Sequence, residues 1–180
     1  MNTGFSKIVH FSDLASGTKR YKISLEPEQR QQVAAFLDLI TIEKLDGFME
    51  LTGHAKTRLI SLSGTLDADV SGRCVVTGKA VPQAINVKFR RQFTEDPDQA
   101  QWDHDDEDVH PSGVDDPPDL VENDEIDIGF VLIEELSLDL DPYPHAPEAK
   151  NFVYQEDRNS DAETPPDREN PFAVLKKLKE

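Results

Sequence analysis

The chain has 180 residues, of which 36 are Asp or Glu and 19 are Lys or Arg, so its formal net charge is −17. This length suffices for one domain with a buried core. A single cysteine excludes an intrachain disulfide and a multi-cysteine zinc site. No apolar run approaches the ~18 residues of a membrane span, and the start of the sequence lacks a secretory pattern. We therefore expect a cytoplasmic protein that binds no membrane.

The first fifty residues predict strands around one helix. Residues 7–11 and 21–25 have strand propensity, the second through alternation of polar and apolar side chains. Pro27 and its acidic neighbours are typical of a helix start, and the apolar spacing that follows predicts a helix over residues 27–39. Residues 43–54 predict a further strand, with a less regular apolar pattern.

The strongest pattern is a strand of period two from Ile60 to Cys74. Every even position is apolar or Gly, and the odd positions between them are polar, which predicts one buried face. After a turn at residues 77–79, residues 81–93 alternate again, so the two runs predict an antiparallel hairpin. Cys74 falls on the apolar side, and we expect a buried, unreactive thiol there.

The polar side of this hairpin is the candidate binding surface. Lys88 and Arg90 alternate with apolar residues, Arg73 lies on the polar side of the preceding strand, and Arg91 is nearby. Basic side chains on one sheet face are able to hold phosphates. Two alternatives are an ordinary solvated face and a face covered by the C-terminal helix. The candidate contacts for nucleic acid or another partner are therefore Arg73, Lys88, Arg90 and Arg91.

Beyond the hairpin, an acidic segment precedes a second helix. Residues 95–125 are rich in Asp, Glu, Pro and Gly and nearly lack aliphatic residues, which predicts a mobile acidic insertion. Residues 127–140 predict a helix with Asp127 as its N-cap. We expect residues 126–144 to complete the single domain that residues 1–94 begin.

The C-terminal region is polar and Pro-rich. Residues 145–169 predict a disordered linker. Residues 170–180 predict a short capped helix, with Asn170 as the cap and lysines at its end. Its apolar side chains suit docking on a partner or, equally, on the protein's own sheet. The candidate docking residues are Phe172, Leu175 and Leu178.

The sequence contains no pattern for catalysis, a cofactor or a metal. The Gly78-Lys79 pair fails the spacing of a phosphate loop, and the acidic run from Asp103 to His110 lacks the Gly and Glu positions of a calcium loop. The histidines fit no zinc-protease pattern, and neither a nucleophile elbow nor a dinucleotide fingerprint occurs. We therefore expect a binding protein without catalytic activity, cofactor or small-molecule substrate.

Together these elements predict an α+β fold. A curved antiparallel sheet carries two packed helices, an acidic disordered insertion and a Pro-rich C-terminal region. The charge divides unequally, because residues 1–94 carry a net charge of +4 and residues 95–180 a net charge of −21. The acidic half repels nucleic acid, so two alternatives stay open. Either the first half contacts RNA locally, or the second half binds a basic protein.

Four segments form an ordered set over roughly residues 55–180. They are Cys74-Val75-Val76-Thr77; Val87-Lys88-Phe89-Arg90 through Phe93; Ile126-Asp127-Ile128-Gly129 with Glu134-Glu135-Leu136 and Pro142-Tyr143-Pro144; and Asn170-Pro171-Phe172-Ala173-Val174-Leu175. In this order they resemble the YceD family, the large ribosomal RNA subunit accumulation proteins. Many members carry Cys-x-x-Cys where this chain has Cys74 and Thr77. Because Thr cannot replace a thiolate ligand, this departure argues against a metal or redox role here.

The resemblance implies a bacterial, cytoplasmic, non-enzymatic protein. Such a protein supports the synthesis, processing or stability of 23S ribosomal RNA, with that RNA or the precursor large subunit as its partner. The resemblance also implies ribosomal protein L32 as a candidate partner. The alternative class is an acidic protein-interaction or chaperone-like module that shields a basic ribosomal protein such as L32.

Overall fold

The computed structural model describes residues 5–14, 17–54, 56–100 and 117–151. By its contacts the chain divides into two units, Met1–Lys150 and Asn151–Glu180, and all the α-helices and β-strands described belong to the first unit. The described elements in chain order are β1 (Ile8–His10), η1 (Ser12–Leu14), β2 (Gly17–Ser24), α1 (Pro27–Phe36), β3 (Thr41–His54), β4 (Leu59–Arg73), β5 (Ala80–Thr94), β6 (Asp119–Leu120), β7 (Glu125–Asp127), α2 (Ile128–Asp139) and η2 (Pro147–Asn151).

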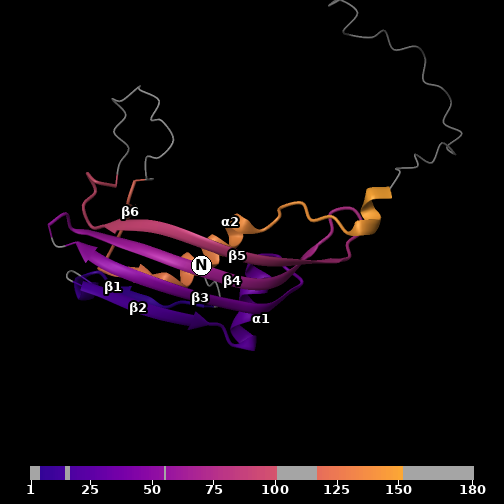
Figure 1. Cartoon of the computed structure of the whole chain (residues 1–180), viewed down its shortest axis with the longest axis horizontal. Coiled ribbons are helices and arrows are strands. Elements are labelled where there is room, and N and C mark those ends of the chain that lie inside the picture. The colour runs from indigo at the N-terminus through magenta and orange to yellow at the C-terminus, as the bar shows by residue number, and fades with distance from the viewer. Residues whose placement is uncertain (1–4, 15–16, 55, 101–116, 152–180) are drawn as a thin grey trace, which may run out of the picture. The chain divides into compact units, whose positions relative to one another are not determined.

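Five strands form the main sheet, in the order β2-β3-β4-β5-β6 (Figure 1). The strands β2 to β5 are antiparallel neighbours, and β6 adds a short parallel pairing at the end of β5. The strands β1 and β7 form a separate antiparallel pair. The predicted α+β fold is confirmed, because two α-helices accompany a mostly antiparallel sheet.

The two strands of the predicted hairpin, β4 and β5, pair along their whole length, from Arg73 with Ala80 to Leu59 with Thr94. The even positions of β4 are buried, as the alternation predicts. The odd positions of β5 and the inward positions of β3 face the same way. This shared inner face supplies much of the core, including Leu45, Met49, Leu51, Ile60, Leu62, Leu66, Val70, Ile85 and Phe89.

The helix α2 covers this inner face. Its side chains Leu132, Ile133 and Leu136 are almost completely buried. A Cβ at Gly47 of β3 would lie only 2.7 Å from Leu132 Cδ1, so the glycine permits the close approach of helix and sheet. In Figure 1 the helix runs behind the strands β3 to β5.

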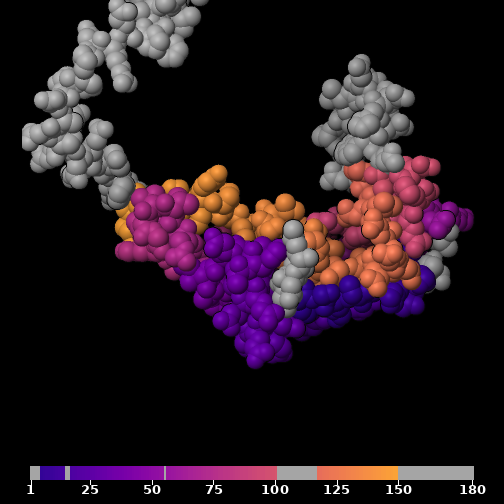
Figure 2. Space-filling model, turned by 180° about the vertical axis from the view of Figure 1, so that it is seen from behind, coloured from indigo at the N-terminus to yellow at the C-terminus, as the bar shows by residue number. Residues whose placement is uncertain are grey.

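Asp127 fixes the start of α2. Its Oδ1 atom accepts hydrogen bonds from the N–H groups of Gly129 and Phe130, both at 3.0 Å, and from the N–H group of Lys7 at 2.8 Å. The predicted N-cap is confirmed. The same carboxylate also ties the helix to the residue before β1. Figure 2, seen from the helix side, shows residues 117–127 beside the N-terminal strand.

The helix α1 ends at Phe36, three residues before the predicted end. Asp38 has a φ of 54°, which is left-handed and incompatible with a continuing right-handed helix. The start agrees with the prediction, because Pro27 is in the first turn and Glu26 and Gln29 form a capping box.

The structure differs from the predicted insertion, residues 95–125, on its C-terminal side. Asp119 and Leu120 pair with the end of β5, and the N–H group of Val121 donates to the Thr94 carbonyl at 2.7 Å. The Val121 side chain is buried. Isolated aliphatic residues in an acidic context give no sequence signal for such long-range pairing.

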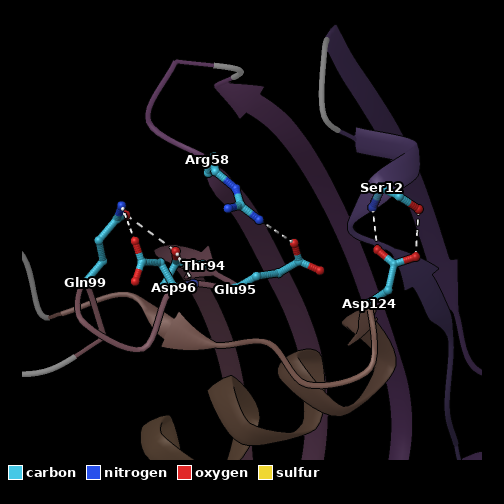
Figure 3. Close-up of polar contacts among 7 residues, drawn as sticks. All are labelled: Ser12, Arg58, Thr94, Glu95, Asp96, Gln99 and Asp124. Carbon is cyan, nitrogen blue, oxygen red and sulfur yellow. Dashed lines mark hydrogen bonds and ion pairs between the residues drawn. The ribbon is translucent and has the colours of Figure 1, made fainter.

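Both ends of the acidic segment are held by polar contacts (Figure 3). On the outgoing side, the Asp96 N–H group donates to Thr94 Oγ1 at 3.1 Å, and Gln99 Nε2 donates to Asp96 Oδ2 at 3.2 Å. On the returning side, Asp124 accepts the N–H and hydroxyl groups of Ser12 at 2.6 and 2.7 Å. Residues 101–116 lie outside the described part of the chain.

The predicted disordered linker, residues 145–169, begins with ordered residues. Ala146, directly before the 3-10 helix η2, and Ala149 within it are buried in a cluster with Cys74, against which Val81 packs. Small side chains in a polar context hide this packing from sequence analysis. Residues 152–180, with the predicted docking residues Phe172, Leu175 and Leu178, lie outside the described residues. In the described part of the chain, no helix is long and apolar enough to cross a membrane.

We predict that Gly64→Ala destabilises the protein. The added Cβ would lie 2.7 Å from Cε2 of Phe89, whose ring packs across Gly64. Overpacking of a core costs about 1–3 kcal/mol of unfolding free energy, which urea denaturation measures. Ser63→Ala, on the neighbouring outward position, is the matched control and should change the unfolding free energy by less than about 0.5 kcal/mol. An unchanged urea midpoint for Gly64→Ala would contradict the packing.

Candidate nucleic-acid interface

The outer face of the sheet, formed by the outward side chains of β2 to β5, is opposite the face that α2 covers (Figure 1). It exists because side chains alternate between the two faces of a strand, so that burial of one set exposes the other. No helix among the described residues lies across it. Of the residues predicted to bind a partner, this face carries Arg73, Lys88 and Arg90.

Two of these cations are neighbours and the third is distant. Lys88 pairs with Thr65 and Arg90 with Ser63, so these basic side chains are two positions apart on β5. Both are exposed. Arg73 lies on the same face but ten positions further along β4 than Ser63, which corresponds to roughly 33 Å at the rise of an extended strand.

Arg91 points to the inner side and is bound by three carboxylates. Its Nε donates to Glu135 Oε1 of α2 at 2.8 Å, and one terminal nitrogen lies 3.1 Å from Glu134 and 3.3 Å from Asp119 of β6. Its side chain is 22 % exposed. The guanidinium therefore joins β5, β6 and α2, and it is not open to a phosphate in this structure.

The electrostatic environment of Arg91 fits this role. Burial lowers the pKa of Arg91. Its hydrogen bond to Glu135 and the charge of Glu134 raise the pKa by more than this, so the net shift is upward. Burial raises the pKa of Glu134, and the positive charge of Arg91 offsets part of this rise. Removing the cation would leave the mostly buried Glu135 without its charge partner.

Further cations on the outer face come from β2 and β3. Arg20, Lys22 and Lys44 all point outward. Arg20 is bound to Glu50 at 2.5 Å, and Lys44 to Asp67 at 2.8 Å. Among the described residues, no ion pair occupies the remaining cations of this face, which are Lys22, Arg73, Lys88 and Arg90.

Two neighbouring cross-strand rows form what we call the basic strip. One row is Arg20, Glu50, Ser63 and Arg90, and the other is Lys22, Phe48, Thr65 and Lys88. These eight residues hold four cations and one carboxylate, a net charge of +3. An acidic chain can bind phosphates only where its surface is locally positive, and the basic strip is such a surface.

Phe48 is the one apolar residue of the basic strip, and its side chain is 45 % exposed. Sequence analysis placed it in a strand but gave it no role. The sequence did hold a signal, because Leu45, Met49 and Leu51 occupy odd positions and Phe48 an even one. The structure buries these odd positions, so Phe48 points outward. Lys22 was likewise given no role, although it stands next to the apolar Ile23. Ile23 is buried, so Lys22 points outward.

An open hollow of about 890 Å³ adjoins the Arg90 end of the basic strip. Its outer-face lining is polar and includes Thr52, Ser61 and Gln92. The lining also includes Asp119 and Glu135, so the hollow continues over the edge of β5 toward α2. Hydroxyl and amide groups at such a place are able to hydrogen-bond base edges or sugars.

Cys74 lies far from the basic strip, in the turn after β4. The predicted burial is confirmed, because its side chain is 2 % exposed. The N–H groups of Ala146 and Thr77 donate to its Sγ atom at 3.2 and 3.4 Å. Burial raises the pKa of the thiol, but these hydrogen bonds outweigh it and lower the pKa to about 6.

The described residues contain no cluster of His, Cys, Asp and Glu that suits a metal ion. The fold and the site thus define an α+β protein whose sheet has one helix-covered face and one partly basic face that no described helix covers. A comparison with protein families identifies the family: the model described as "Large ribosomal RNA subunit accumulation protein YceD" matches residues 62–179. The chain belongs to this family, as the resemblance implied, and membership places it among proteins of ribosome biogenesis. No curated protein and no solved structure gives a significant match.

We predict opposite outcomes for two adjacent arginines. Arg91→Gln should lower the unfolding free energy by about 2 kcal/mol, because Glu135 loses a charged hydrogen bond in a mostly buried site. Arg90→Gln, one residue away on the outer face, is the matched control and should lie within about 0.5 kcal/mol of the wild type. Urea denaturation measures both. Equal stability of the two variants would show that Arg91 has no structural role.

We predict that Cys74 makes stability depend on pH. Its folded pKa of about 6 lies below the value of about 8.5 for an unfolded thiol. The thiolate therefore contributes stability in full above pH ~8.5 and none below pH ~6. The unfolding free energy should rise over this window more steeply in the wild type than in Cys74→Ser. Parallel pH profiles for the two proteins would contradict the lowered pKa.

Proposed function

We propose that this protein supports the accumulation of 23S ribosomal RNA by binding precursor large-subunit RNA through the outer face of its sheet. The observation that carries the proposal is the set of cations on that face without ion-pair partners in the described structure, chiefly Lys88 and Arg90. Arg73 extends the contact along the hairpin. The role is that of a binding protein without catalytic activity.

Two further facts support RNA as the partner. The family is described by the accumulation of large-subunit ribosomal RNA, and phosphates are the anions that this RNA offers in excess. Of the acids nearest the strip, Glu50 is bound to Arg20 and Asp67 to Lys44, while Asp46 accepts a hydrogen bond from the Ser24 hydroxyl. Short-range attraction at Lys88 and Arg90 is therefore compatible with a net charge of −17, since repulsion is screened beyond about 8–10 Å at physiological salt.

A second function is favoured by the charge division. Residues 95–180 carry a net charge of −21, which suits an acidic module that shields a basic ribosomal protein such as L32. In that case the acidic segment would bind the partner, and the outer face would have no role. Residues 101–116 contain seven acidic residues and neither Lys nor Arg, so their deletion tests this function separately.

We predict that reversal of charge at Arg73, Lys88 and Arg90, each to Glu, spares folding and weakens binding to precursor large subunits at least tenfold. The three side chains are exposed and make no ion pair among the described residues, so the thermal midpoint should stay unchanged. Co-sedimentation on sucrose gradients measures the association, at about 50 and about 200 mM salt. The loss of affinity relative to the wild type should be largest at low salt, because the cations act by neutralising phosphates.

A matched control changes the net charge equally without touching the outer face. It reverses Lys19, Lys56 and Lys79, of which Lys19 pairs with Asp13 and Lys79 with Glu148, so the thermal midpoint of this variant is measured first to establish that it is folded. If it weakens binding as much as the first variant, the effect is one of total charge and the outer face has no special role. If the first variant binds normally while deletion of residues 101–116 abolishes binding to L32, the shielding function replaces the proposed one.

A further inference from the structure

We propose that the basic strip binds single-stranded RNA and that Phe48 is the platform on which one base stacks. This inference rests on the proposed function, and it adds the form of the RNA and the residue that recognises it. Base stacking on an aromatic side chain combined with a positive groove is the usual physical basis of single-strand binding.

The position of Phe48 carries the proposal. It lies in the middle of β3, pairing with Lys22 of β2 and Thr65 of β4, and 45 % of its side chain is exposed. A large aromatic residue at an outward, helix-free position contributes little to the core. Its exposed surface is therefore available to a ligand, and a base presents the flat apolar surface that fits it.

The surroundings of Phe48 favour a nucleic acid over a protein. Its outward neighbours on its own strand are Asp46 and Glu50, and those across the sheet are Lys22 and Thr65. All four are polar, so the ring is not part of a contiguous apolar patch. Protein interfaces usually have an apolar core of several residues, whereas a stacked base needs one aromatic surface.

Cations lie on both sides of the ring. Lys22 is one strand away, at a spacing of about 4.8 Å, and Lys88 is two strands away on the other side, at about 9.6 Å. Neither forms an ion pair in the described structure. A strand of RNA that stacks a base on Phe48 would thus place its flanking phosphates near a lysine on each side, which adds an electrostatic contribution to the stacking.

The geometry favours a single strand over a duplex. A base reaches a protein ring only when it is not stacked and paired within a helix. Phe48 is one isolated platform on a sheet, and the polar hollow next to Arg90 offers room for a neighbouring nucleotide. Duplex RNA would present only its phosphates and hydroxyls to the strip, and Phe48 would then contribute nothing.

The test uses the full-length protein and a fluorescent 12-nucleotide single-stranded RNA of mixed sequence, with the same sequence as a blunt duplex for comparison. Fluorescence anisotropy measures the affinity. Phe48→Ala should weaken single-strand binding about tenfold, the size expected for one stacked base, and Phe48→Trp should restore it. Phe36→Ala is the matched control, because Phe36 has a similar exposure of 42 % on α1; it should bind normally.

The salt dependence separates stacking from charge. Phe48→Ala should leave the slope of log affinity against log salt unchanged, because it removes no phosphate contact. Lys22→Gln combined with Lys88→Gln should reduce the slope by about 1.4, at about 0.7 per phosphate on a single strand. The thermal midpoint of the lysine variant should equal that of the wild type, since both lysines are exposed. Phe48→Ala and Phe36→Ala each remove a partly buried ring and should lower the midpoint by similar, small amounts while the protein stays folded.

The outcomes separate failure of this inference from failure of the proposed function. The proposal that a base stacks on Phe48 is wrong if Phe48→Ala binds the single strand as well as the wild type or better. It is also wrong if the duplex binds as tightly as the single strand. The proposed function then stands if reversal at Arg73, Lys88 and Arg90 still weakens binding. If the wild type binds neither RNA nor precursor large subunits, the proposed function fails and the platform fails with it.

Discussion

Burial of one face of the three long strands β3, β4 and β5 beneath α2 is the constraint on which the rest of the structure depends. The inward side chains meet Leu132 and Leu136 of the helix, and Gly47 lets the helix approach closely. Because side chains alternate along each strand, this burial also decides which side chains face outward. The candidate interface is thus a consequence of the core: Lys88, Arg90 and Phe48 are exposed because their neighbours are buried.

The distribution of charge shows how an acidic chain retains a basic surface. Some of the acids of the second half have structural partners: Glu134, Glu135 and Asp119 bind Arg91 on the inner side of the sheet. On the outer face, only Glu50 enters the basic strip, and Arg20 neutralises it. The remaining net charge repels nucleic acid at long range. We therefore expect the protein to bind RNA of arbitrary sequence weakly. Tight binding should depend on contacts within a few ångströms, which favours a defined RNA site over non-specific attachment to phosphates.

The sequence predicted those parts of the fold that depend on local patterns. The alternation from Ile60 to Cys74 predicted β4, its buried face and its hairpin with β5, and Asp127 was recognised as a cap. The strand β6 could not be predicted, because two residues pair through contacts that no local pattern encodes. The role of Arg91 was equally hidden: it stands next to Arg90, and only its carboxylate partners from distant segments reveal that it is structural.

The candidate site was predicted only in part, because half of the basic strip lies on β2 and β3, before the hairpin from which the site was predicted. The cations of β5 lie within the family match, residues 62–179, and alternation alone identified them. Lys22 and Phe48 precede the match, and only the strand register brings them beside Lys88. The basic strip therefore combines cations from the matched hairpin with an aromatic platform from the strands before it. If both halves bind the same RNA, the loss on substituting Phe48 and Lys88 together should differ from the sum of the single losses, since residues that share one ligand act jointly.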